Sequence, residues 1–284
     1  TRIIDISYEF CRRIIANEKR ESTIADAFRG IIRNPATADD YSSMLNRAGF
    51  YDDSSYTVIS LSILRKSVSI TESVVRTTDM SLWRMLKKSG NHSSLFMKEG
   101  DLVAVRQNCS EEEIVMFCEL LRPIAEQSAD TEIYIGVSES LRGFAEISQA
   151  YEQSYAAMLT GRIKGKERVF YRDIGLMKLI FGVKDKMILS SFAEENLGVL
   201  HRYDSEKNTD YCSILRKYLE LNGSVLEAAA ETGVHRNTIN YKIRAIREIL
   251  GRELDDHTKS MLMLAYLIED VLDIYDNLNG GNKQ

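Results

Sequence analysis

The chain has 284 residues, of which 44% are hydrophobic and 28% are charged, and its formal net charge is −5 at pH 7. This composition is ordinary for a soluble protein of about two domains. The acidic balance argues against nucleic-acid binding by the whole surface, yet it permits a local basic patch. No run approaches the roughly 18 apolar residues of a membrane span. The four cysteines form no CxxC pair, which favours reduced thiols in a cytoplasmic protein over disulfides or a zinc site: Cys11, Cys109, Cys118 and Cys212.

Residues 1–52 are predicted as a helical lead-in. Apolar positions recur at helical spacing over residues 1–33. This segment is either the end of a longer connecting helix, such as a coiled coil between protomers, or a helix packed on its own domain. Pro35 interrupts the pattern, and a short helix over residues 39–48 ends at Gly49. Because the chain begins with Thr1 instead of methionine, we expect a fragment that lacks an upstream sensor domain.

Residues 53–173 alternate strand and helix patterns. Apolar, β-branched runs predict strands over residues 56–64, 94–97, 102–105, 132–137 and 169–171. The second and third strands flank a Lys98-Glu99-Gly100-Asp101 hairpin turn. Helices are predicted over residues 71–88, 110–129 and 144–160, the second of them starting with a Ser110–Glu113 capping box and interrupted at Pro123. The order strand, helix, hairpin, helix, strand, helix predicts a ferredoxin-like α+β domain.

The remaining chain shows only helical patterns. Residues 174–208 are predicted as a helical linker that is broken at Gly182 and Gly198. Residues 209–278 are predicted to form an all-α helix-turn-helix domain, and residues 279–284 a tail. The predicted fold class is therefore an α+β domain followed by an all-α domain.

Within 209–278, six residues are predicted to shape the helix-turn-helix. A first helix covers residues 210–221, and the second and third are joined by a short glycine turn. Ser224 caps the second helix with Glu227 in capping-box position, and Ala229, in an alanine run, permits close helix packing. The turn and the inward stripe of the third helix supply the other four: Gly233 as the left-handed residue, Val234 as the apolar plug, and Ile239 and Ile243.

The third helix carries the candidate DNA contacts. Its outward face presents Asn237, Asn240, Tyr241 and Arg244, and asparagine can read adenine while arginine can read guanine. Phosphate contacts are predicted for the residues around this face: His235, Arg236, Thr238, Lys242 and Arg247. For His235, a capping or packed role fits equally well. Residues 236–247 hold four basic residues and no acidic one, whereas residues 253–276 hold seven acidic residues and one lysine. The basic charge is thus concentrated on one helix, and double-stranded DNA is the expected partner.

The run Val234-His-Arg-Asn-Thr-Ile-Asn-Tyr-Lys-Ile243 resembles the hydrophobic-His-Arg-Asn-Thr-hydrophobic-x-Tyr-Arg-Leu run of PucR/CdaR-type bacterial transcription regulators. Lys242 departs from the pattern, because arginine is usual there; the charge is kept but the guanidinium fork is lost. The resemblance covers about residues 211–275 and implies a Fis-like helix-turn-helix. It further implies a preceding degenerate GGDEF-like domain, which residues 56–171 resemble, and an effector-controlled homodimer. The family's effector-sensing domain has no counterpart in this chain.

The same resemblance raises the question of catalysis. Diguanylate cyclases bind metal and substrate through a Gly-Gly-Asp/Glu-Glu-Phe hairpin and an aspartate after the first strand. Here the hairpin Met97–Leu102 lacks the paired glycines, and Arg65 and Lys66 stand where the carboxylate is expected, which opposes Mg²⁺ binding. We predict no enzymatic activity, no cofactor and no metal site. Two alternatives remain: a nucleotide- or metabolite-binding module whose C-terminal helices mediate only protein contacts, and a nucleotide cyclase, which the missing residues oppose.

Overall fold

The structure, a computed structural model, describes residues 22–65, 93–121 and 131–280. The chain divides into two compact units, residues 1–178 and 179–284, and each unit has its own hydrophobic core. Across the described ranges, no helix is both long and apolar enough to cross a membrane. The helix predicted over residues 71–88, and the end of the one predicted over 110–129, lie outside the described residues.

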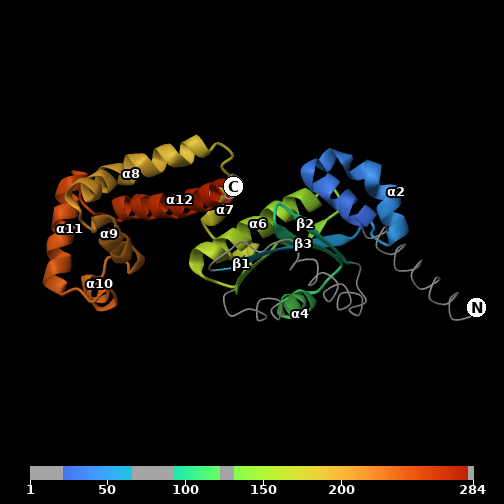
Figure 1. The fold of residues 1–284 in the computed structure, drawn as a ribbon, viewed down its shortest axis with the longest axis horizontal. Helices are drawn as coiled ribbons and strands as arrows, with labels where there is room; N and C mark the ends of the chain where they lie inside the picture. Colours follow the sequence, from blue (N-terminus) through green and yellow to red (C-terminus); the bar gives the residue numbers. More distant parts are fainter. Residues whose placement is uncertain (1–21, 66–92, 122–130, 281–284) are drawn as a thin grey trace, which may run out of the picture. The chain divides into compact units, whose positions relative to one another are not determined.

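The N-terminal unit is built on a mixed sheet with strand order β2-β3-β1-β4-β6 (Figure 1). β1 pairs antiparallel with both β3 and β4, and β2 pairs antiparallel with β3, which is the ferredoxin-like arrangement predicted from the element order. β6 extends the sheet parallel to β4, and the short β5 pairs with the start of β1. The strands are β1 (Ser55–Arg65), β2 (Ser93–Lys98), β3 (Asp101–Gln107), β4 (Thr131–Val137), β5 (Leu141–Arg142) and β6 (Arg168–Phe170).

The predicted hairpin is confirmed between β2 and β3. Glu99 and Gly100 form its turn, with φ angles of 53° and 92°. Two consecutive residues at positive φ match the right-handed twist of the flanking strands.

Helices cover both faces of the sheet (Figure 1). The side chains of β1 alternate, so Tyr56 and Val58 pack in one core while Ile59 and Leu61 pack in the other. α6 (Ile147–Lys164) packs on the first face, and α4 (Glu111–Leu121) packs on the second. The capping box predicted for α4 is present, because Ser110 Oγ accepts from the Glu113 N–H at 3.2 Å and Glu113 Oε2 accepts from the Ser110 N–H at 2.8 Å.

The boundary of the α+β domain lies earlier than predicted. A lead-in over residues 1–52 is expected to be separate, but helical residues 22–33 and α2 (Ala38–Ala48) pack into the same core as Tyr56. Phe28, Ile31 and Leu45 are each 0% exposed there. Of the two readings of the early helix, packing on its own domain holds for residues 22–33. Two 3₁₀ turns complete this unit, η1 (Pro35–Thr37) and η2 (Tyr171–Asp173).

The C-terminal unit consists of helices around a second core. α8 and α12 lie side by side, and α9, α10 and α11 gather at one end of that pair (Figure 1). Leu197 of α8, Leu215 of α9, Ala228 of α10, Ile239 of α11 and Leu262 of α12 are each 0% exposed in this core. The helices of this unit are α8 (Lys186–Lys207), α9 (Tyr211–Glu220), α10 (Val225–Thr232), α11 (Arg236–Leu250) and α12 (Asp256–Gly280), and α7 (Met177–Gly182) spans the division between the two units.

The region predicted as a helical linker, residues 174–208, differs from the prediction in where its helices break and in its packing. α7 ends at Gly182 as predicted, but α8 runs unbroken through Gly198, so the predicted break there is wrong. Leu197 and Leu200 flank this glycine and are each 0% exposed. Their burial outweighs the roughly 1 kcal/mol that glycine costs inside a helix. α8 is thus an integral part of the C-terminal core.

Candidate nucleic-acid interface

The turn between α10 and α11 has the geometry that the sequence predicts. Ser224 is the N-cap of α10 and its Oγ accepts from the Glu227 N–H at 3.3 Å. In the predicted capping box the Ser224 N–H would also donate to the Glu227 side chain. In the structure this N–H donates to Leu221 O instead, at 2.9 Å. Gly233 ends α10 in the left-handed region with φ 69°, where glycine carries no Cβ penalty. Val234 and Ala229 pack against the core, as expected of the plug and the small helix-packing residue.

α11 is strongly two-sided. Ile239, Ile243 and Ile246 are 0%, 4% and 0% exposed, so the predicted inward stripe is confirmed. These side chains fix the rotation of α11 about its own axis. Asn237, Asn240, Tyr241 and Arg244 are all exposed, and Tyr241 exposes 69% of its surface. An exposed tyrosine beside two asparagines and an arginine leaves four hydrogen-bonding groups on one outward helix face.

His235 begins α11. Its Nδ1 accepts from the Asn237 N–H at 3.2 Å, so the ring caps the helix. In the neutral ring this hydrogen bond leaves the proton on Nε2, and the side chain is exposed. His235 can therefore cap the helix through Nδ1 and still donate from Nε2, which unites two roles that the sequence left as alternatives.

The remaining candidate phosphate contacts differ in their present partners. Arg236 and Thr238 are exposed in the first turn of α11, where amide groups also favour an anion. Arg247 is exposed and lies 3.6 Å from Glu253. Lys242 is the most enclosed of the set: its Nζ lies 2.5 and 2.7 Å from the two carboxylate oxygens of Asp210, and its side chain is 19% exposed.

Asp210 is a functional candidate that the sequence reasoning missed. It occupies the N-cap of α9 but makes no capping hydrogen bond. Asp204 caps α9 instead, accepting from the N–H groups of Tyr211 at 2.9 Å and Cys212 at 2.8 Å. Burial raises the pKa of Asp204, but these hydrogen bonds and one from Thr209 outweigh it and hold the pKa below its ordinary value. Because Asp204 takes the cap, the Asp210 carboxylate is free to bind Lys242.

The hairpin of the N-terminal unit, the position of a cyclase site, buries its aspartate. Asp101, directly after its turn, is only 9% exposed. Burial raises the pKa of its carboxyl to about 6, partly offset by a hydrogen bond from Ser62. The side chains of Arg65 and Lys66, on which the argument against Mg²⁺ also rests, lie outside the described residues. Within the described ranges, no group of three or more His, Cys, Asp or Glu side chains could hold a metal ion.

The thiols of Cys118 and Cys212 are not activated. Burial raises the pKa of the Cys118 thiol to about 12, and burial with the Asp204 carboxylate does the same for Cys212. The thiolate is the reactive form, so both thiols stay protonated near neutral pH.

Comparison with known proteins agrees with this arrangement. Residues 211–268 match the family described as the PucR C-terminal helix-turn-helix domain, and residues 33–158 match the GGDEF-like domain. The second match begins well before residue 53, in line with the packing of α2 on the sheet. The proline-responsive transcriptional activator PutR of Bacillus subtilis is 25% identical over 146 residues, which are 50% of this chain. The match covers 36% of that protein's own length.

A solved structure is also similar. The regulator of polyketide synthase expression from Bifidobacterium adolescentis shares 18% identity, with a TM-score of 0.41, over 87% of this chain and 97% of that one.

A GGDEF-like domain followed by a helix-turn-helix of this kind is the domain arrangement of a transcription regulator. The two matches and the similarity to PutR support a PucR-type regulator.

Proposed function

We propose that the chain is a sequence-specific DNA-binding transcription regulator and that α11 reads bases in the major groove. One observation carries the proposal: α11 buries an isoleucine stripe and leaves Asn237, Asn240, Tyr241 and Arg244 exposed on the outward face. The second helix of such a motif enters the major groove with its N-terminal residues at the base edges. The asparagines suit adenine and Arg244 suits guanine.

The flanking groups position the helix in this proposal. His235, Arg236 and Thr238 lie in the first turn, and Lys242 and Arg247 lie further along α11. Contacts of this kind bind phosphates and set register without reading sequence. Lys242 must exchange the Asp210 carboxylate for a phosphate to contribute.

The rest of the proposal concerns assembly and control. One reading helix covers few base pairs, so we propose a cytoplasmic homodimer on a palindromic or repeated site. An effector then changes the spacing or exposure of the two reading helices.

We also propose that the GGDEF-like domain does not act as a cyclase. The hairpin carries Lys98-Glu99-Gly100-Asp101 and lacks the paired glycines, and Asp101 is buried. Incubation of the purified chain with GTP and Mg²⁺ is expected to give no cyclic dinucleotide; detection of that product contradicts the proposal.

The test of DNA reading begins with selection of bound sequences from a random DNA pool by the full chain. Arg244→Ala is expected to cost about 1–3 kcal/mol of binding free energy and to relax preference at one or two base pairs. Arg202→Ala removes an exposed arginine of α8 and is the matched control. If Arg244→Ala combined with Asn237→Ala leaves affinity and footprint unchanged, α11 is not the reading helix. A chain that stays monomeric on operator DNA contradicts the dimer. Absence of any salt-dependent DNA binding favours the non-catalytic binding module instead.

A further inference from the structure

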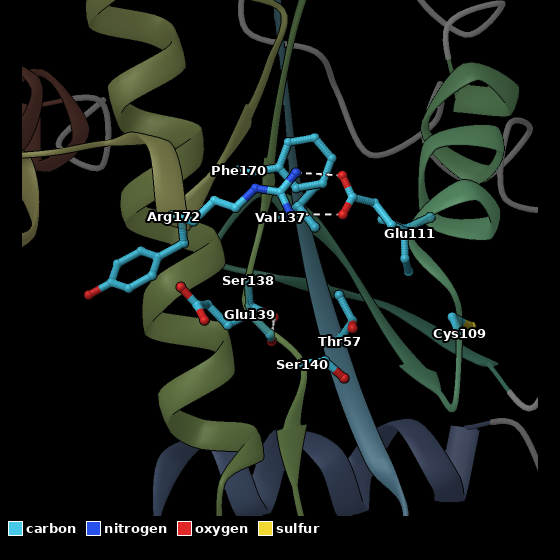
Figure 2. A pocket seen from close by; sticks show the side chains of 11 residues that line it. Thr57, Cys109, Glu111, Val137, Ser138, Glu139, Ser140, Phe170 and Arg172 are labelled. Carbon is cyan, nitrogen blue, oxygen red and sulfur yellow. Dashed lines mark hydrogen bonds and ion pairs between the residues drawn. The ribbon is translucent and has the colours of Figure 1, made fainter.

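A cavity of about 180 Å³ opens in the N-terminal unit where β4 and β6 end (Figure 2). Val137 and Phe170, the last residues of these two parallel strands, are paired in register and both line it. The crevice beyond the carboxyl ends of parallel strands is the usual place for a ligand in an open sheet. Thr57, near the start of β1, also lines it, whereas the hairpin turn lies toward the other end of β1. The cavity is therefore separate from the position of a cyclase hairpin site.

The wall of the cavity carries a hydroxyl group that the fold leaves available. Thr57 lines the cavity and is 5% exposed as a residue, and none of the hydrogen bonds among the described residues involves its hydroxyl. Ser138 offers the contrast, because its Oγ accepts from the Val58 N–H at 2.8 Å and donates to Glu139 O at 2.7 Å. The Thr57 hydroxyl can therefore exchange a hydrogen bond with water for one with an occupant of the cavity.

Charged groups of both signs surround the cavity. The Arg172 guanidinium grips the Glu111 carboxylate with two hydrogen bonds, Nη1 to Oε2 at 2.8 Å and Nη2 to Oε1, and lies over the Phe170 ring at 4.8 Å (Figure 2). Arg172 is thus already arranged to hold a carboxylate in a fork. Both side chains are about half exposed, at 52% and 54%, so the exchange of Glu111 for another carboxylate costs little.

Glu139 supplies the second carboxylate. Its backbone is fixed, because the Glu139 N–H donates to Gln153 Oε1 at 3.0 Å and its carbonyl accepts from Ser138. Its carboxylate forms a loose ion pair with Lys178 Nζ at 4.0 Å. A loosely paired carboxylate on a fixed backbone is a ready acceptor for an ammonium group.

We propose that this cavity binds a small zwitterion, an α-amino acid with an apolar side chain. The ligand carboxylate takes the place of Glu111 on Arg172, and the ammonium group lies against the Glu139 and Glu111 carboxylates. The Thr57 hydroxyl gains its partner from the ligand, whose side chain packs on Ile114, Val137 and Phe170. A plain anion meets the Glu111 and Glu139 carboxylates, and a plain amine has no carboxylate with which to bind Arg172. The volume lies below the roughly 300–1,000 Å³ of pockets for drug-sized ligands, which restricts the ligand to a small one.

Three probes that share the branched four-carbon group of valine test the class of ligand on the full chain. L-valine carries both charges, 3-methylbutanoate lacks the ammonium group, and isobutylamine lacks the carboxylate. Calorimetry is expected to show binding of L-valine, with each analogue weaker by about tenfold or more because it loses a charge-assisted hydrogen bond. Methyl signals of Thr57, Ile114 and Val137 are expected to shift in NMR spectra with L-valine. Equal binding of either analogue overturns the zwitterion assignment.

Variants then tie binding to the cavity. Arg172→Ala and Glu139→Gln are each expected to weaken amino-acid binding by about tenfold or more. Glu112→Gln, an exposed neighbour of Glu111 that does not line the cavity, is the control and is expected to bind normally. Unchanged binding by Arg172→Ala, or no methyl shift with any proteinogenic amino acid at millimolar concentration, overturns the proposal. Because the readout is direct ligand binding, either result leaves the proposal for DNA reading untouched.

Discussion

At the scale of single residues, the ion pair of Lys242 with Asp210 determines how much positive charge α11 offers in the proposed complex with DNA. Lys242 Nζ lies 2.5 and 2.7 Å from the carboxylate oxygens of Asp210, and only 19% of the lysine side chain is exposed. A lysine releases a counterion from DNA when it neutralises a phosphate, and Lys242 cannot do so while it is paired with the carboxylate. Asp210 therefore competes with phosphate for Lys242 in the proposed complex. The ion pair of Lys242 and Asp210, which are 32 positions apart in the chain, is expected to weaken DNA binding.

Asp210→Asn is expected to tighten DNA binding and to steepen its salt dependence. One additional freed lysine raises the magnitude of the slope of log K against log salt by about 0.9. Fluorescence anisotropy over a series of salt concentrations measures both effects. Glu194→Gln, which makes the same charge change at an exposed site on α8, is the control. If Asp210→Asn differs from Glu194→Gln in neither affinity nor slope, Lys242 does not contact phosphate.

Asp101 gives a second prediction at this scale. Burial raises the pKa of its carboxyl to about 6, above the ordinary 3.8. The unfolded chain therefore ionises first as pH rises, and stability is lost between about pH 4 and pH 6. Asp101→Asn removes the ionisation, so the variant is expected to be more stable than the natural chain at pH 7, by about 2–3 kcal/mol at roughly 1.4 kcal/mol per pKa unit. Urea unfolding at several pH values checks this; an advantage that persists undiminished at about pH 4 contradicts it.

At the scale of elements, Gly136 sets the approach of β4 to α6. A Cβ at this position would lie 1.9 Å from Ser154 O and 2.2 Å from Met158 N, both backbone atoms of α6. Packed atoms cannot approach this closely, so β4 and α6 would have to move apart to admit the Cβ. Ser60 and Ser154, whose hydroxyl groups are 2.7 Å apart and buried, would lose their contact in the same movement.

Gly136→Ala is therefore expected to prevent folding of the N-terminal unit. Gly165→Ala is the matched control, because Gly165 has φ 60° but meets nothing within 4 Å of an added Cβ. That substitution is expected to cost only the left-handed backbone penalty of about 1–2 kcal/mol. Circular dichroism and urea unfolding compare the two; similar stabilities would show that the sheet and α6 adjust freely.

The elements also show which parts of the fold the sequence could predict. Local signals were sufficient for the Glu99–Gly100 hairpin, the Ser110 cap and the isoleucine stripe of α11, since each depends on residues within a few positions. The predicted helix break at Gly198 was wrong because the energetic cost of glycine in a helix is outweighed there by core packing, which only the tertiary structure supplies. In the candidate site, exposure of Asn237 and Arg244 followed from periodicity. The pairing of Lys242 with Asp210 did not, because no local pattern connects α9 with α11.

At the scale of the whole molecule, the two units carry separate cores. In the described chain, the buried clusters around the sheet draw on residues 25–151, and the helical cluster draws on residues 197–266. Cooperative unfolding follows shared buried surface, so each unit is expected to unfold as its own cooperative step. A regulator built in this way can lose or alter one unit while the other keeps its structure.

Paired variants test this independence. Ile243 is 4% exposed in the helical core, and Ile243→Ala is expected to destabilise the C-terminal unit by about 2–5 kcal/mol. It should lower one unfolding transition in calorimetry, whereas Gly136→Ala should abolish the other. The Gly136→Ala chain is further expected to keep the amide exchange protection of α11, because the Ile239, Ile243 and Ile246 stripe packs wholly within the C-terminal unit. If each variant shifts both transitions by the same amount, the two units fold as one, and a signal in either unit would reach the reading helix through folding itself.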